Sequence, residues 1–248
     1  MYPKLIINLN GIIDNMHIIQ KVCKKRNISL SVTTKLLSGN KEMVTSLVEN
    51  GAECICDSKI ENLILYQNLN VEKWLIRLPM LSEIHEVVKY ADVSLNSELV
   101  TIQALNEEAK KQNKTHKIIL MYELGDLREG CLKEELKLLL KECFNLKNIE
   151  VYGLGVNLSC YGEILPNDEN MLELALLVDE LEEEFNIKFK IVSGGNSSSY
   201  EMLCEDKLPE QINNLRMGEL IYLGRIPCLE KEVPTLNQDN FILKAQII

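Results

Sequence analysis

The chain has 248 residues, of which 46% are hydrophobic, so it can bury a sizeable core within one large domain. Its formal net charge of -10 argues against a nucleic-acid-binding surface. No apolar run is long enough to span a bilayer, and the first residues lack the apolar run of a signal peptide, so a cytoplasmic protein without membrane attachment is expected. The eight cysteines include no C-x-x-C pair and the three histidines lie far apart, so we expect reduced thiols and no metal site.

Short β-rich apolar runs alternate with longer amphipathic runs along nearly the whole chain. A first strand is predicted at 5–9 and a helix at 12–26. Eight further strands are predicted at 30–35, 53–56, 73–78, 93–95, 116–123, 151–158, 189–192 and 214–217. Between them the apolar spacing predicts helices at 41–50, 58–67, 82–90, 97–112, 133–144 and 169–185, and short helical turns follow the last two strands.

This repeated strand–helix unit predicts an α/β fold, a (β/α)8 TIM barrel, in about the length that such barrels need. A doubly wound open sheet is the competing architecture, and it fits less well because no Gly-x-Gly-x-x-Gly follows the first strand. We predict that the barrel domain covers residues 1–236. Residues 237–248 are predicted to begin a C-terminal β-domain that this chain lacks, or to form a strand that pairs back on the barrel.

Lys35 stands at the end of the strand predicted at 30–35. In barrels and open α/β sheets, functional sites gather at the carboxyl ends of the strands. A lysine amine at such a place can attack a carbonyl and form a Schiff base. For Lys35 taken alone, an ordinary lysine that reaches solvent is the alternative.

A Gly- and Ser-rich loop follows the strand predicted at 189–192 and contains Gly194, Gly195, Asn196 and Ser197. Glycines let backbone amides approach a ligand, and serine hydroxyls together with a helix start suit an anion. Barrels frequently bind phosphate in the loops after strands seven and eight, where this loop falls. The sequence therefore predicts a phosphate cradle, with a capping loop as the alternative.

Arg216 lies between Leu215 and Met217 in the last predicted strand, so its side chain is expected to point the opposite way, into the barrel mouth. Gly218, just after it, allows close backbone approach at a helix start. An ordinary ion pair of Arg216 with Glu219 or Glu123 is the alternative.

Two more polar clusters follow strands, one at 123–130 with Arg128 and one at 157–162 with Asn157. A solvated turn and a strand leaving the barrel are their alternatives. Taken together, a reactive lysine, a phosphate cradle and an arginine able to face a ring nitrogen or a carboxylate predict pyridoxal 5'-phosphate (PLP) as the cofactor.

In this order the motifs resemble those of the fold-type III, PLP-dependent alanine/ornithine racemase family, and the ornithine racemase branch is the nearest. The matching motifs lie at 2–4, 33–35, 57–62, 77–80, 95–98, 125–130, 193–199 and 214–219. The resemblance covers essentially the whole chain and implies an isomerase that interconverts L- and D-amino acids.

The resemblance also implies roles for individual residues. Lys35 would form the internal aldimine and serve as one of two racemisation bases, and Arg128 would lie near the cofactor phenolate and the substrate carboxylate. Arg216 would face the pyridine nitrogen and keep it unprotonated. The remaining cofactor contacts are expected from Asn157, Asn196, Ser197, Gly218 and Glu219.

The substrate would be ornithine, alanine or a similar amino acid, and Glu123 and Asp126 are candidates to receive the amine of a basic side chain. Two-domain members of the family continue into a β-domain that supplies, across a dimer, the tyrosine acting as second base. The resemblance is thus compatible with a homodimer, although no tyrosine of this chain matches that role by motif. The alternative function is a single-domain PLP carrier without racemase activity.

Overall fold

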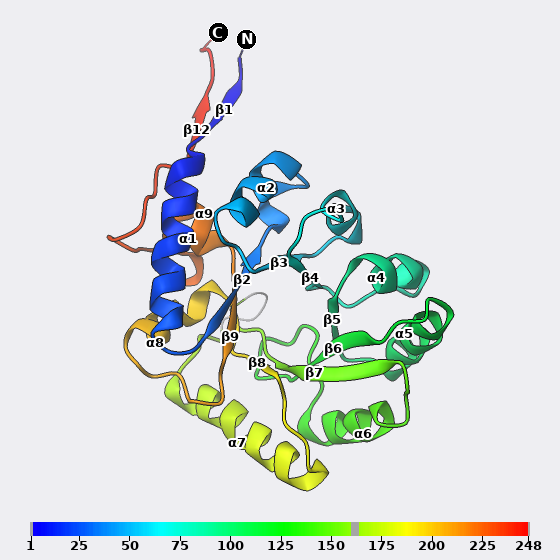
Figure 1. Cartoon of the computed structure of the whole chain (residues 1–248). Coiled ribbons are helices and arrows are strands. Elements are labelled where there is room, and N and C mark those ends of the chain that lie inside the picture. The colour runs from blue at the N-terminus through cyan, green and yellow to red at the C-terminus, as the bar shows by residue number, and fades with distance from the viewer. Residues whose placement is uncertain (1, 160–163, 248) are drawn as a thin grey trace.

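The computed structural model describes residues 2–159 and 164–247. Eight parallel strands close into a barrel in chain order, and β2 pairs with β9 to complete the ring (Figure 1). The strands are β2 (Ser29–Thr33), β3 (Cys54–Asp57), β4 (Glu72–Leu75), β5 (Val93–Asn96), β6 (His116–Met121), β7 (Ile149–Gly155), β8 (Ile191–Ser193) and β9 (Asn214–Met217). The predicted (β/α)8 barrel is confirmed, with eight barrel strands after a first strand that stands apart.

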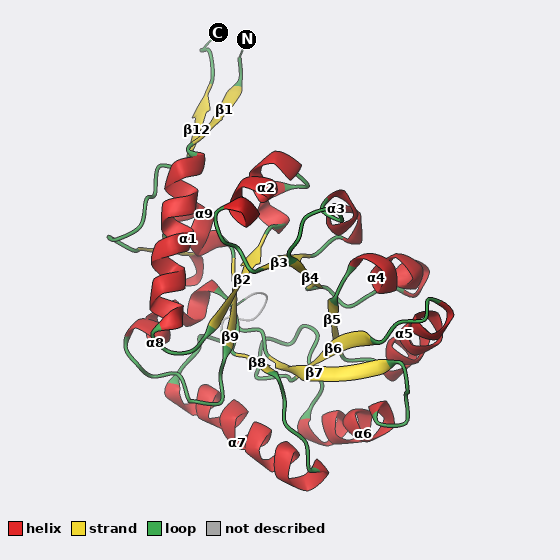
Figure 2. Ribbon diagram, viewed as in Figure 1, coloured by secondary structure: helices red, strands yellow, loops and turns green. Residues whose placement is uncertain are grey.

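Helices surround the barrel on its outside (Figure 2). They are α1 (Leu9–Lys24), α2 (Lys41–Glu49), α3 (Ile60–Leu65), α4 (Ile84–Tyr90), α5 (Leu99–Lys111), α6 (Lys133–Cys143), α7 (Asp168–Phe185), α8 (Tyr200–Cys204) and α9 (Glu219–Leu223). Most predicted boundaries lie within two or three residues of these. The α1 helix precedes the barrel and lies against α9, so the first and last helices are neighbours in space.

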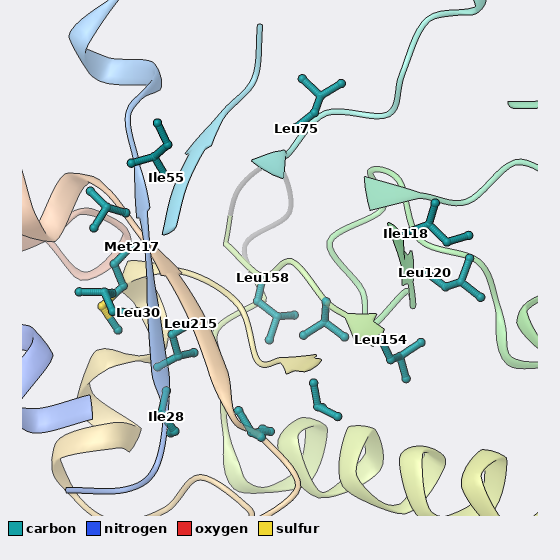
Figure 3. Close-up of a cluster of buried hydrophobic side chains, with 14 of the residues drawn as sticks. Ile28, Leu30, Ile55, Leu75, Ile118, Leu120, Leu154, Leu158, Leu215 and Met217 are labelled. Carbon is teal, nitrogen blue, oxygen red and sulfur yellow. The ribbon is translucent and has the colours of Figure 1, made fainter. Parts of the chain in front are cut away.

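The strands bury side chains on both faces, because the barrel has a filled interior and an outer layer beneath the helices. Cys54, Cys56, Trp74, Val93, Leu95, Ile119 and Met121 form the interior cluster. The intervening residues of the same strands, such as Ile55, Ile118 and Leu120, belong to the larger cluster shared with the helices (Figure 3). This alternation explains why the barrel strands contain almost continuous apolar runs.

The two ends of the chain form a ribbon outside the barrel. Strand β1 (Lys4–Ile7) pairs antiparallel with β12 (Phe241–Lys244), with Ile7 opposite Phe241 (Figure 1). The final strand therefore pairs with the first strand and not with a barrel strand. The predicted division at residue 236, which separates these two paired strands, stays a prediction.

Asparagines fasten the segment before β12 to the barrel. Asn15, fully buried in α1, donates to the carbonyls of Ile221 and Asn237 at 3.0 and 2.9 Å. Asn240, also fully buried, donates to the carbonyl of Tyr222 at 3.0 Å. Between α9 and Asn237 the chain forms a short hairpin of β10 (Arg225–Ile226) and β11 (Lys231–Glu232). The α9 helix begins at the barrel mouth, and these bonds hold its C-terminal half.

Candidate active site

A cavity of about 250 Å³ opens where the barrel strands end at their carboxyl termini. Its lining residues are Thr33, Lys35, Ser58, Ile76, Arg128, Asn157, Ser159, Asn196, Ser197, Ser198, Arg216, Gly218, Glu219 and Cys228. They come from the carboxyl ends of seven of the eight barrel strands, from the loops that follow these strands and from the segment after α9. All eight residues that the sequence assigned to catalysis or cofactor binding lie in this lining: Lys35, Arg128, Asn157, Asn196, Ser197, Arg216, Gly218 and Glu219.

Lys35 is held by the two residues that precede it. Strand β2 ends at Thr33, two residues earlier than predicted, and Lys35 begins a short 3-10 turn. Thr34 donates its amide to the carbonyl of Cys56 at 2.7 Å and its hydroxyl to the buried carboxylate of Asp57 at 2.8 Å. The hydroxyl of Tyr222, from α9, donates to the carbonyl of Thr33 at 2.9 Å. Bonds from β3 and from α9 thus fix the backbone that carries the Lys35 amine.

Arg216 is 3% exposed and points into the barrel mouth, as its position between two apolar residues predicted. Its guanidinium donates to the hydroxyl of Ser193, to the carbonyl of Val156 at 2.7 Å and to Oδ1 of Asn157 at 2.6 Å. These acceptors lie at the ends of two neighbouring strands, so a fixed positive charge sits in the wall of the cavity.

The loop after β8, the seventh barrel strand, forms one end of the cavity. Gly195 has a φ of 107°, a backbone conformation that side chains rarely adopt. Asn196 caps the following turn through the amide of Ser198 at 2.9 Å and donates to the carbonyl of Leu158 at 2.8 Å. The hydroxyl of Ser197 accepts the amide of Leu220 at 3.3 Å, which ties this loop to the start of α9.

Two features of this end fit a phosphate group. The hydroxyl of Ser198 is buried and finds no hydrogen-bond partner among the described residues. A Cβ added at Gly218 would lie 3.0 Å from both the Cβ and the carbonyl oxygen of Thr33, so a side chain there would have to displace Thr33 slightly. A buried donor that lacks an acceptor and a tightly packed backbone without a side chain both suit a phosphate ester bound against backbone amides.

The loop between β6 and α6 carries Arg128. Glu123 stabilises this loop from within, because its carboxylate accepts the amides of Gly125 and Leu127 at 2.5 and 3.0 Å. Neither Glu123 nor Asp126 lines the cavity, so the structure does not bring these two candidates for binding a basic side chain to the other site residues. Arg128 does line the cavity, and its Nε lies 2.7 Å from the carboxylate of Glu129.

Some lining residues carried no individual assignment in the sequence analysis. Ser58 and Ser198 belong to the motifs at 57–62 and 193–199, and Ser159 belongs to the polar cluster at 157–162, so their membership of these stretches could have marked them. Ile76 and Cys228 belong to no motif. Cys228 follows α9, and it reaches the mouth because the segment after α9 folds back over the barrel. Of the cluster predicted at 157–162, positions 160–162 lie outside the described residues.

Within residues 2–159 and 164–247, no helix is long and apolar enough to cross a membrane. The same residues contain no group of three or more His, Cys, Asp or Glu side chains arranged to hold a metal ion.

A parallel barrel with a lysine, two arginines and a glycine- and serine-rich loop at its mouth is typical of barrels that bind a phosphorylated ligand at the ends of their strands. Residues 7–226 match the family model described as "Alanine racemase, N-terminal domain", and the chain belongs to this family.

Two curated relatives match along the whole chain. The chain is 45% identical over 249 residues to an ornithine racemase of Acetoanaerobium sticklandii, and it covers 70% of that protein. It is 32% identical over 250 residues to a lysine racemase of Thermotoga maritima, again covering 70% of the relative. Among solved structures, an alanine racemase of Clostridium difficile 630 in complex with cycloserine has a TM-score of 0.81 at 18% identity, covering 99% of this chain and 68% of that one.

Proposed function

We propose that the chain is a PLP-dependent amino-acid racemase that acts on a basic amino acid, with ornithine as the first candidate. The observation that carries the proposal is that residues from separate motifs meet in one cavity. The two relatives above 30% identity are racemases of ornithine and lysine, and they support this reading over a PLP carrier.

The residues of the cavity fit PLP. Lys35 would hold the cofactor through its aldehyde carbon, and the region of Ser197, Gly218 and Glu219, with the unsatisfied hydroxyl of Ser198, would hold its phosphate. When bound, PLP supplies an electron sink that lowers the cost of removing the α-proton of an amino acid.

The side chains of this chain would then manage orientation and protons. Arg216 is always charged and donates only, so it opposes a second positive charge on the group that it faces. Because this second positive charge is opposed, return of the proton to Cα is favoured over its transfer to another atom. We propose that Arg128 receives the substrate carboxylate and that Asn157, held by Arg216, lies against the ring region, with Asn196 shaping the phosphate end.

We propose that the Lys35 Nζ takes or returns the α-proton on one face of the substrate, and that a second base serves the other face. A lysine amine suits both tasks because it is a nucleophile and a base. A homodimer and a cytoplasmic location stay predictions.

The test is α-proton exchange in heavy water, followed by mass spectrometry, with PLP-loaded protein and a panel of L-amino acids. We expect exchange to be faster with ornithine and lysine than with alanine. Lys35→Ala should lose both the visible absorption of the lysine-bound cofactor and all exchange. A Lys35-dependent absorption without exchange on any amino acid would favour the PLP carrier instead.

A further inference from the structure

Glu129 joins three residues of the proposed site into one chain of hydrogen bonds. Its Oε2 lies 2.7 Å from Nε of Arg128, and its Oε1 accepts a hydrogen bond from Nδ2 of Asn157. Asn157 in turn accepts from Arg216 through Oδ1 at 2.6 Å. The glutamate side chain is 11% exposed, so these bonds form largely away from water.

We infer that Glu129 is a positioning residue that sets the orientation of both Arg128 and Asn157 for the reaction. This inference rests on the proposed racemase function. Glu129 does not line the 250 Å³ cavity; it lies behind Arg128 and lines a neighbouring cavity that Arg128 also borders. Both of its carboxylate oxygens face donors of the site, so its role is to hold those donors and not to take a proton from substrate.

The amide of Asn157 shows why a carboxylate is needed at this position. An asparagine side chain has a donor end and an acceptor end, and its partners decide which end points where. Glu129 accepts from the Nδ2 end, which leaves Oδ1 directed at the Arg216 guanidinium. A donor in place of either carboxylate oxygen would oppose Asn157 or Arg128.

Charge gives the second reason. Arg128 and Arg216 both line the cavity, and the Glu129 carboxylate is bonded directly to one and through Asn157 to the other. Hydrogen bonds between charged groups are shorter and stronger than neutral ones, and a planar guanidinium bonded at Nε has one preferred orientation. The other donor edge of Arg128 is thereby kept available for a ligand carboxylate.

The backbone around Glu129 is fastened as well. Its carbonyl accepts a hydrogen bond from the hydroxyl of Ser97, at the end of β5, and the carbonyl of Ser97 accepts from the thiol of Cys131 at 3.1 Å. The carboxylate therefore projects from a backbone that is tied to a barrel strand, although it lies in a loop. Precise placement of this kind is what a residue that orients others requires.

The test is Glu129→Gln, which keeps the shape of the side chain and turns one acceptor into a donor. We expect KM for the amino acid to rise roughly 10- to 100-fold, as for loss of one hydrogen bond to a charged group, with a smaller change in kcat. The dissociation constant of PLP, titrated by absorbance on the apoprotein, should change less than about 3-fold. Glu134→Gln, an exposed carboxylate in the first turn of α6, is the matched control and should change none of these values.

A double-mutant cycle separates positioning from a general loss of structure. If Glu129 acts through Arg128, adding Glu129→Gln to Arg128→Ala should change KM by less than about 3-fold. Effects that multiply in the double variant, or a Glu129→Gln protein whose PLP affinity and melting temperature fall together with activity, would overturn the inference. Failure of the proposed function would be distinct, because the wild-type protein would then show no α-proton exchange at all.

Discussion

Two buried tyrosines provide a matched test of how the lysine-bearing turn is held. Tyr222 and Tyr66 are both 0% exposed, and both lie near Asp57. The hydroxyl of Tyr222 donates to the carbonyl of Thr33 at 2.9 Å, whereas that of Tyr66 finds no partner among the described residues. Burial, with a smaller contribution from Asp57, raises the pKa of Tyr66 from 10.0 to about 12, so the hydroxyl is protonated at neutral pH.

Replacing each tyrosine by phenylalanine removes one hydroxyl from a fully buried place. In Tyr222→Phe the Thr33 carbonyl loses a buried donor, which costs about 1–3 kcal/mol of unfolding free energy. For a chain of this size we expect the melting temperature to fall by roughly 3–10 °C. In Tyr66→Phe only an unsatisfied hydroxyl is removed, so the melting temperature should stay the same or rise.

The same pair tests the link to the site. Because Thr33 lies two residues before Lys35, Tyr222→Phe should also weaken PLP binding, by roughly 3- to 10-fold on the basis of one lost neutral hydrogen bond. Tyr66→Phe should leave it unchanged. The assays are thermal unfolding of the apoprotein and absorbance titration with PLP. If both substitutions lowered the melting temperature equally, the loss of a phenol oxygen would explain the effect, and the argument that the Tyr222 hydrogen bond stabilises the turn would be refuted.

Two further predictions concern pH and backbone approach. Burial, and then the charge of Lys114, lowers the pKa of His116 from 6.5 to about 4, and its ring bonds the Ser94 hydroxyl at 2.8 Å. The folded state therefore binds the proton less well than the unfolded state. The free energy of unfolding is highest above pH 6.5 and falls by about 3 kcal/mol as the pH drops toward 4. In His116→Gln, the free energy of unfolding measured with urea should change less between pH 6.5 and 4 than in the wild type. An equal change in both proteins would contradict the role given to His116. Gly218→Ala should raise the dissociation constant of PLP about 10-fold, because the new Cβ would press on Thr33; an unaltered titration curve would show that this close approach is not needed.

Local patterns were sufficient to predict the fold and the direction of key side chains. The alternation of Leu215, Arg216 and Met217 predicted a charged residue facing the barrel mouth between two apolar residues facing out. In the structure Leu215 and Met217 are fully buried in the outer layer, and Arg216 lies in the cavity wall. Such inferences succeed because strand and helix periodicity is a property of the backbone and is written in consecutive residues.

Contacts between distant segments depended on which strands lie side by side in the barrel. The bond from Glu129 to Asn157 joins residues that are 28 positions apart, and the bond from Tyr222 to Thr33 spans 189 positions. No local pattern encodes such pairs, because the first needs β6 to lie beside β7 and the second needs β2 to meet β9. For the same reason the sequence predicted a first strand and a last strand but not that β1 and β12 would pair with each other outside the barrel. The sequence alone thus determined that Lys35 and Arg216 face the mouth, and only the tertiary structure decided which residues hold one another there, since side-chain direction is local and side-chain partnership is not.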